Sequence, residues 1–261
     1  RLAVPVVLLL ARLGQPVGVD LDEAALEEPV HGAGGQHEDA VQAHDAGALL
    51  DALEQLLAVA LALHLGRDTA SSLAGLCMLD VGCGGGLMSE ALARYGANVV
   101  GVDASPGNVA AARLHAQAQN VTVDYRLGEP AKVLSPHERF DAVLALEVVE
   151  HVSDVPAFLA AAADRLAPGG ILFVSTIDRT FKSFAVAIVG AEYLLRVLPR
   201  GTHQWSMFVR PEELRSALAP SKLHMNKLRG MRYLPVLHKA SWCKDTKVNY
   251  IATFTHTAHS K

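Results

Sequence analysis

The chain has 261 residues, 51% of them hydrophobic, so it is long enough for one α/β domain with an extension and too apolar to be disordered throughout. Its net charge of -4 hides an asymmetry, because lysine and arginine are absent between residues 13 and 66 and frequent after residue 179. The three cysteines form no C-x-x-C pair, which argues against a zinc cluster or a disulfide framework and favours a reducing compartment. No apolar run reaches the ~18 residues of a membrane-spanning helix.

Residues 1–70 form a compositional zone of their own, rich in alanine, leucine, glycine, aspartate and histidine. Their hydrophobic periodicity is weak, and residues 20–54 are too acidic for a transit peptide. We predict an N-terminal extension of unknown structure over residues 1–70 and the main domain over residues 71–261.

From residue 76 onward, strand and helix signals alternate. We expect strands at 77–81, 98–102, 121–125, 140–146 and 170–176, and helices at 86–95, 106–118 and 155–166. This alternation predicts a parallel sheet with helices on both faces, a Rossmann-like, doubly wound α/β fold. The pattern then predicts an insertion at about 178–210 with a helix at 181–198, a helix at 211–219, and a terminal antiparallel hairpin of strands near 223–234 and 246–255.

A glycine-rich turn follows the first expected strand. Gly82, Gly84 and Gly86 form a G-x-G-x-G pattern shortly after Asp80, and glycine allows positive φ and the close approach of a ligand. The next strand ends at Asp103, about 20 residues further on, where an acid meets a ribose hydroxyl in nucleotide-binding folds. The two strand ends therefore predict a nucleoside-binding crevice.

A nicotinamide or flavin site is the competing interpretation. Its G-x-G-x-x-G pattern needs a third glycine at position 87, where this chain has leucine. Asp80 also suits a ligand with a cationic amino-acid end better than a pyrophosphate, and a loop without a ligand would leave both acids unexplained. We therefore predict S-adenosylmethionine as the ligand, bound by Asp80, Gly82, Gly84 and Asp103.

Two acids and a histidine follow the strand expected at 140–146. If a helical turn begins at Glu147, then Glu147, Glu150 and His151 stand at i, i+3 and i+4 and share one face. They predict a divalent-metal site, in which Mg2+ would bind a phenolate, or an acid/base site in which His151 takes the proton directly. The alternative without chemistry is a helix start whose acids are favoured by the helix dipole.

Five segments together resemble the ubiquinone-biosynthesis O-methyltransferases. They are Leu79-Asp-Val-Gly-Cys-Gly-Gly-Gly86, Glu147-Val-Val-Glu-His-Val152, Val189-Gly-Ala-Glu-Tyr193, Pro199-Arg-Gly-Thr-His-Gln-Trp205 and Val248-Asn-Tyr250. The resemblance covers residues 75–255 and implies a class I S-adenosylmethionine-dependent methyltransferase. It implies that Gly82, Asp103 and Leu146 contact the donor, and that the metal ligands are Glu147, Glu150 and His151.

The implied reaction is methyl transfer from S-adenosylmethionine to a catechol-type hydroxyl of a polyprenylated ubiquinone precursor, at two steps of the pathway. The segment Gly201-Thr-His-Gln-Trp205 resembles the mitochondrial, plant-like branch. That branch implies a peripheral position on the matrix side of the inner membrane, and a bacterial cytoplasm is the alternative.

Several partners are expected besides the polyprenylated phenol. Phe181, Phe184, Ile188 and Leu195 follow helical spacing beside basic residues, which predicts contact with a membrane surface; packing on the domain is the alternative. A ubiquinone-biosynthesis complex is a further candidate partner, and no nucleic acid is expected.

One feature of the family is missing from the expected place. Its members carry an upstream tryptophan pair and an Asn-Pro-x-Arg element whose arginine contacts the donor carboxylate, and residues 1–75 contain neither. Two alternatives therefore stay open: a methyltransferase for another small phenol or lipid, or a non-catalytic donor-binding member of a biosynthetic complex. A nicotinamide oxidoreductase is least favoured because of Leu87.

Overall fold

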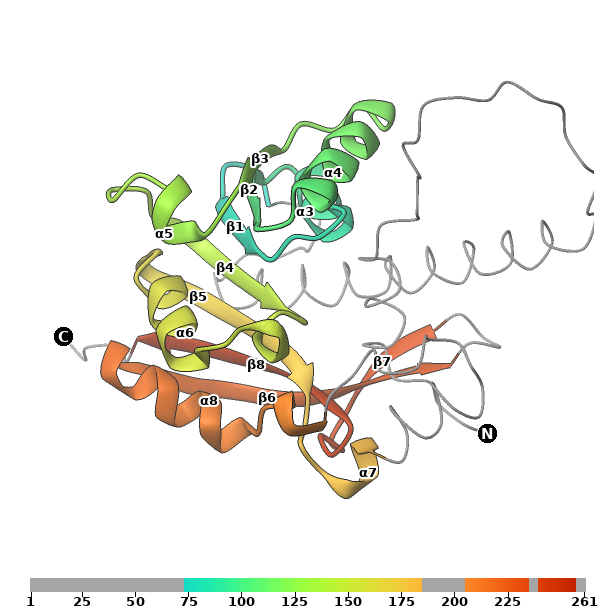
Figure 1. The fold of residues 1–261 in the computed structure, drawn as a ribbon, viewed down its shortest axis with the longest axis vertical. Helices are drawn as coiled ribbons and strands as arrows, with labels where there is room; N and C mark the ends of the chain where they lie inside the picture. The colour runs from blue at the N-terminus through green and yellow to red at the C-terminus, as the bar shows by residue number, and fades with distance from the viewer. Residues whose placement is uncertain (1–72, 185–204, 235–238, 257–261) are drawn as a thin grey trace, which may run out of the picture.

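The computed structural model describes residues 73–184, 205–234 and 239–256, and the strands in these ranges form one sheet (Figure 1). They are β1 (Cys77–Val81), β2 (Asn98–Asp103), β3 (Asp124–Leu127), β4 (Phe140–Leu146), β5 (Leu166–Ile177), β6 (Leu223–Leu234), β7 (Lys239–Cys243) and β8 (Asn249–His256). Their order is β3-β2-β1-β4-β5-β8-β6-β7, with β1 to β5 parallel and β8, β6 and β7 antiparallel to their neighbours. The expected doubly wound α/β fold is confirmed.

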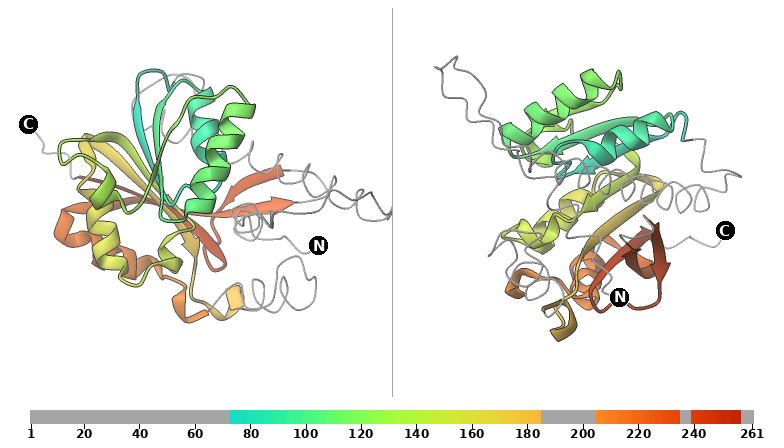
Figure 2. Two further views of the ribbon diagram at one scale, coloured as in Figure 1. Left: turned by 45° about the horizontal axis from the view of Figure 1, so that its top comes forward. Right: turned by 90° about the vertical axis from the view of Figure 1, so that its right-hand side faces the viewer.

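Helices cover both faces of the sheet. They are α3 (Leu87–Arg94), α4 (Pro106–Ala118), α5 (Pro130–Val133), α6 (Val155–Ala163), α7 (Phe181–Ser183) and α8 (Pro211–Leu218), with short 3-10 turns η1 (Val149–His151), η3 (Trp205–Met207) and η4 (Ala219–Ser221). Figure 2 shows α3 and α4 on one side of the parallel strands, and α6 and α8 lie side by side on the other. Because neighbouring residues of a buried strand face opposite helix layers, β4 is apolar along almost its whole length.

The antiparallel part of the sheet is larger than the expected hairpin. Strand β7 pairs with the outer end of β6, while β8 lies between β5 and β6. Strand β3 starts at Asp124 rather than 121, because the chain leaves α4 through Asn120 at φ 53 and Val121 still bonds back to the helix. Of the helix expected at 181–198, α7 covers the first turn and the remainder lies outside the described residues.

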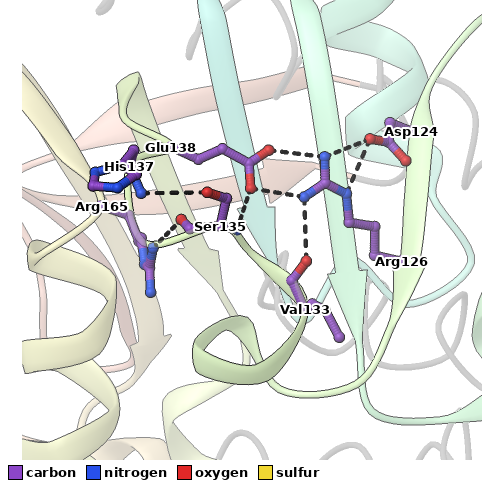
Figure 3. Close-up of polar contacts among 7 residues, drawn as sticks. All are labelled: Asp124, Arg126, Val133, Ser135, His137, Glu138 and Arg165. Carbon is purple, nitrogen blue, oxygen red and sulfur yellow. Dashed lines mark hydrogen bonds and ion pairs between the residues drawn. The ribbon is translucent and has the colours of Figure 1, made fainter.

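A charged network fastens the loop between α5 and β4 (Figure 3). Arg126 on β3 pairs with Asp124 at 2.7 Å and with Glu138 at 2.9 Å, and it also donates to the carbonyl oxygen of Val133. These bonds raise the pKa of the Arg126 guanidinium, and Arg126 in turn lowers the pKa of the Glu138 carboxyl. The network therefore ties the loop before β4 to the edge strand β3.

None of the helices in the described part of the chain has the length and apolarity needed to cross a bilayer.

Candidate functional site

The glycine loop after β1 is bonded to the end of β2. The backbone N–H groups of Gly82 and Cys83 both donate to the carbonyl oxygen of Val102, at 2.7 and 3.1 Å. Gly82 has φ 74, and a Cβ there would lie 2.5 Å from Cγ2 of Val148. Because a side chain would both strain the backbone and clash, the loop needs glycine at this position.

Gly86 shapes the other end of the loop. It has φ 83 and is the N-terminal cap of α3, and the Tyr125 hydroxyl donates to its carbonyl oxygen at 3.0 Å. A Cβ on Gly86 would collide with that hydroxyl and with Ala112. The loop is therefore packed closely against β3 and α4.

Asp103 is held in place at the end of β2. One carboxylate oxygen accepts from the Gly84 N–H at 2.9 Å, and the other accepts from the Ser105 N–H at 2.8 Å and the Asn108 amide at 3.2 Å. The side chain is half-buried and reaches the glycine loop directly. The structure thus brings together Gly84 and Asp103, the two strand ends that the sequence predicts to form one crevice.

Asp80 lies beneath the loop rather than on its surface. It is buried, and the Ser89 hydroxyl of α3 donates to it at 2.6 Å. Burial raises the pKa of Asp80 to about 6; the Ser89 hydrogen bond opposes this rise, and the negative charge of Asp103 adds to it. A nearby cation would favour the ionised form of this carboxyl.

The strand β4 ends at Leu146, and Glu147 has φ 55, so the chain turns there before the single 3-10 turn η1. The expected helical turn from Glu147 onward is therefore wrong. Glu147 accepts from the Ser175 hydroxyl at 2.5 Å, and Glu150 accepts from the Thr176 hydroxyl at 2.8 Å. Glu150 is buried and Glu147 is half-buried with its Oε2 atom enclosed, whereas His151 is exposed, because the turn places it on the outer side.

The two glutamates influence each other. Burial raises the pKa of the Glu147 carboxyl well above its usual value, and the charge of Glu150 raises it further, while the Ser175 hydroxyl lowers it. Glu147 Oε2 is buried and has no hydrogen-bond partner in the described part of the chain. A buried acceptor of this kind calls for a proton or for a donor on a ligand.

The three predicted metal ligands are not gathered at one point. Within residues 73–184, 205–234 and 239–256, no group of three histidine, cysteine, aspartate or glutamate side chains is arranged to hold a metal ion. The paired carboxylates of Glu147 and Glu150 offer oxygen ligands, but exposed His151 does not complete the set. The residues as folded do not fit the predicted three-ligand site, and both the Mg2+ and the metal-binding role of these residues stay predictions.

Three polar side chains at the ends of β5 and β8 have no role in the sequence-based prediction, although Asn249 lies in one of the segments that carry the resemblance. Ser175, Thr176 and Asn249 are all buried, and the first two hold the glutamates. The available signal was a pair of hydroxyl residues closing the apolar run Ile171–Val174. A cavity of about 610 Å³ lies elsewhere, at the amino ends of the parallel strands, where Cys77, Asn98 and Phe140 line it.

Comparison with known proteins identifies the family. The model of the family described as "Methyltransferase domain" matches residues 42–224. The chain is 52% identical to the ubiquinone biosynthesis O-methyltransferase of Azorhizobium caulinodans over 189 residues, which are 72% of this chain and 75% of that protein. It is 49% identical to the protein of the same name from a Methylobacterium species over 192 residues, 73% of this chain and 77% of that one.

Solved structures show the same fold at low sequence identity. The magnesium protoporphyrin IX methyltransferase from Synechocystis with bound SAH aligns with a TM-score of 0.56 and 19% identity, covering 88% of this chain and 90% of that chain. An S-adenosylmethionine-dependent methyltransferase from Clostridium acetobutylicum aligns with a TM-score of 0.52 and 11% identity, covering 70% and 84%. The expected class I methyltransferase fold is confirmed.

The two curated relatives are bacterial, which agrees with a bacterial protein; the plant-like mitochondrial branch stays a prediction. Identity near 50% covers more than two thirds of both chains in each comparison. The chain belongs to the ubiquinone biosynthesis O-methyltransferases, a family of S-adenosylmethionine-dependent methyltransferases.

Proposed function

We propose that this chain transfers the methyl group of S-adenosylmethionine to a catechol-type hydroxyl of a polyprenylated ubiquinone precursor. The observation that carries the proposal is the 52% identity, over 72% of the chain, with a ubiquinone biosynthesis O-methyltransferase. The glycine loop bonded to the end of β2, with Asp103 beside it, supports the donor assignment independently.

The donor half of the site positions its ligand. S-Adenosylmethionine, when bound, supplies a methyl group on a positively charged sulfur that needs no further activation. Gly82 and Gly84 give the loop the positive φ values that its turn needs, and Asp103 is placed to accept from ribose hydroxyls. The carboxyl of Asp80 favours the cationic amino-acid end, and Leu146 borders the same face of the sheet. The contribution of these residues is orientation, which suffices when the reacting atoms are held in line.

The acceptor half of the site has to remove the hydroxyl proton of the phenolic acceptor. A phenol has a pKa near 10, so a base must take its proton at neutral pH. Glu147 Oε2 is a buried acceptor without a partner in the described structure, at the end of the strand that also carries Leu146. We assign it the role of accepting the acceptor's hydroxyl proton, with Glu150 and Ser175 holding the carboxyl in place. The exposed His151 is the alternative base.

The test is transfer of a labelled methyl group from S-adenosylmethionine to a short-chain prenyl catechol. We expect an O-methylated product. Donor binding without any turnover would favour the non-catalytic alternative, and turnover of unprenylated phenols alone would favour a different small-molecule acceptor. Binding of NAD but not of S-adenosylmethionine would contradict the whole proposal.

A second arm of the assay tests the predicted metal. The enzyme is treated with EDTA, dialysed, and assayed with and without added Mg2+. Loss of turnover that Mg2+ restores would support metal binding at Glu147 and Glu150. Full turnover after complete metal removal would overturn the metal prediction and leave the proton transfer to Glu147 intact.

The polyprenyl tail of the proposed acceptor is apolar, so the enzyme would meet its substrate at a membrane surface. Phe181 is 84% exposed and stacks on Phe184 with ring centroids 6.3 Å apart, beside Lys182, whereas Ile188 and Leu195 lie outside the described residues. We propose that this base of the insertion rests on anionic lipid.

The test is flotation with anionic and with neutral vesicles. We expect binding to anionic vesicles that the double variant Phe181→Ser/Phe184→Ser loses. The control is Leu114→Ser, which removes an exposed leucine on α4. Equal flotation of the wild type, the double variant and the control would contradict the proposal that Phe181 and Phe184 bind the membrane. The mitochondrial location and the biosynthetic complex stay predictions.

A further inference from the structure

Asn249 lies where β6 changes its partner. Strand β8 pairs with β6 as far as Ile251 and Arg229, and from Gly230 onward β6 pairs with β7 instead. At this fork the side-chain oxygen of Asn249 accepts from the Met231 N–H at 3.3 Å. The hydrogen bond fixes the orientation of the amide, because its oxygen is turned toward β6 and its nitrogen must point elsewhere.

No hydrogen bond within the described residues explains the orientation of the Asn249 amide nitrogen. The residue is 1% exposed, and its Nδ2 has no hydrogen-bond partner in the described part of the chain. Buried amide groups normally have partners, since an unpaired donor away from water is costly. The fold accounts for one end of this side chain and leaves two N–H bonds at the other end for a ligand.

The position of Asn249 places it beside the acidic turn. It pairs with Ile177 at the end of β5, two residues beyond Ser175, which holds Glu147. Residues two apart on a strand share a face, about 7 Å apart, and strands lie about 5 Å apart. The unpaired donor of Asn249 and the unpaired acceptor of Glu147 therefore belong to the same face and the same end of the sheet.

This location is on the acceptor's side of the crevice. The glycine loop and Asp103 follow β1 and β2, whereas β4 and β5 separate β8 from β1. Four strand spacings separate β8 from β2 and amount to roughly 19 Å, so the ribose held at β2 is out of reach of Asn249. Of the two substrates of the proposed reaction, the acceptor is therefore the one that Asn249 is placed to meet.

We propose that Asn249 Nδ2 donates a hydrogen bond to the second, non-reacting oxygen of the acceptor's catechol. The proposal rests on the proposed function and narrows its substrate class. A catechol presents one hydroxyl that can donate to Glu147 and a neighbouring oxygen that can accept from Asn249. A ring with a single oxygen leaves the Asn249 amide unpaired, so the residue selects catechols over monophenols.

The test is calorimetric binding of a prenyl catechol and of the matched prenyl monophenol to protein saturated with S-adenosylhomocysteine. The wild type should bind the catechol about tenfold more tightly than the monophenol. Two variants follow. Asn249→Leu removes the whole amide, and Asn249→Asp keeps an oxygen for the Met231 N–H while replacing the N–H donors. Both should reduce the ratio to less than about threefold, with donor affinity unchanged.

The matched control is Asn226→Asp, which alters an exposed amide on β6 that donates to the Thr255 hydroxyl. It should keep the wild-type ratio. A purely structural Asn249 would lower thermal stability in the leucine variant and leave the ratio intact, and that result would overturn the inference. So would a wild type that does not distinguish the two rings. Failure of the wild type to methylate any catechol would instead defeat the proposed function, so the two failures are distinguishable.

Discussion

The donor half and the acceptor half of this site are built from the chain in different ways. The donor half lies between residues 77 and 103, as one strand, one loop, one helix and the next strand. The proposed acceptor half consists of Glu147, Ser175 and Asn249, which come from three separate segments and are brought to one end of the sheet by strand pairing. The first half depends on local backbone geometry, and the second depends on the register of the sheet.

The two halves also differ in whether their polar side chains have hydrogen-bond partners within the protein. In the donor half, Asp103 and Asp80 already have hydrogen-bond donors from the protein. In the acceptor half, Glu147 Oε2 and Asn249 Nδ2 are buried without partners in the described residues. The acids of the donor half are therefore already paired within the protein, whereas the proposed acceptor half keeps two buried polar atoms available for a ligand.

Gly82→Ala should have the largest effect, because it breaks both halves together. The new Cβ would force a strained φ and press on Val148, the residue after Glu147. We expect donor affinity to fall on the order of 100-fold, with a loss of turnover. Calorimetry with S-adenosylmethionine measures the change.

The control for this variant is Gly169→Ala. Gly169 also has a positive φ, of 80°, but no atom lies within 4 Å of its Cβ position. It should lose some stability and keep its donor affinity. Equal donor affinities for the Gly82 variant and the wild type would disprove the close packing of the loop on Val148.

Glu147→Gln separates the halves. The amide cannot take a proton, so we expect kcat to fall about 100-fold while donor affinity stays within twofold of the wild type. Steady-state kinetics and calorimetry measure the two quantities. Glu129→Gln, an exposed acid paired with Lys132, is the control and should change neither. An unchanged kcat in the Glu147 variant would remove this residue from the proton transfer.

Asp80→Asn tests the burial of an acid under the donor loop. The folded protein holds the Asp80 proton more tightly than the unfolded chain, because burial raises its pKa from 3.8 to about 6. Between these two pH values the folded state binds more protons, so the stability contributed by this group falls as pH rises; above about pH 6 the penalty is constant.

The asparagine side chain of Asp80→Asn does not ionise, so the variant lacks the cost of burying a charged carboxylate. The free energy of unfolding of Asp80→Asn, relative to wild type, should therefore rise by on the order of 3 kcal/mol between pH 4 and pH 7. Urea unfolding at the two pH values measures it. A difference that does not change with pH would show that Asp80 ionises normally in the folded protein.

Arg126→Met should have the smallest effect, since the charged network of the α5–β4 loop lies outside both halves (Figure 3). We expect about 1 kcal/mol of destabilisation, because the pairs are partly exposed. Donor affinity and kcat should not change. A large loss of activity would mean that this loop supports the site.

Much of the donor half can be read from sequence, because its signals are local. Strand β1 has the expected bounds, β2 ends one residue later than expected, and the spacing from the glycines to Asp103 predicts the crevice. The loop positions follow from glycine chemistry alone, since φ is positive at Gly82, Gly84 and Gly86.

The acceptor half could not be read in the same way. A helical spacing at Glu147, Glu150 and His151 is visible in the sequence, but the positive φ of Glu147 is not, and it decides which side chains are buried. The role of Asn249 depends on the pairing of Ile177 with β8 and on the fork between β6 and β7. Such contacts between distant segments are set by tertiary packing rather than by local pattern.

The central claim is that the two halves act together on one methyl group. Its most direct test is a single-turnover reaction in which S-adenosylmethionine with a deuterium-labelled methyl group is mixed with excess enzyme and a prenyl catechol, followed by mass spectrometry. We expect one labelled methyl group on a ring oxygen, and Glu147→Gln should slow the transfer. Enzyme that binds the labelled donor and the catechol together yet forms no labelled ether would contradict it.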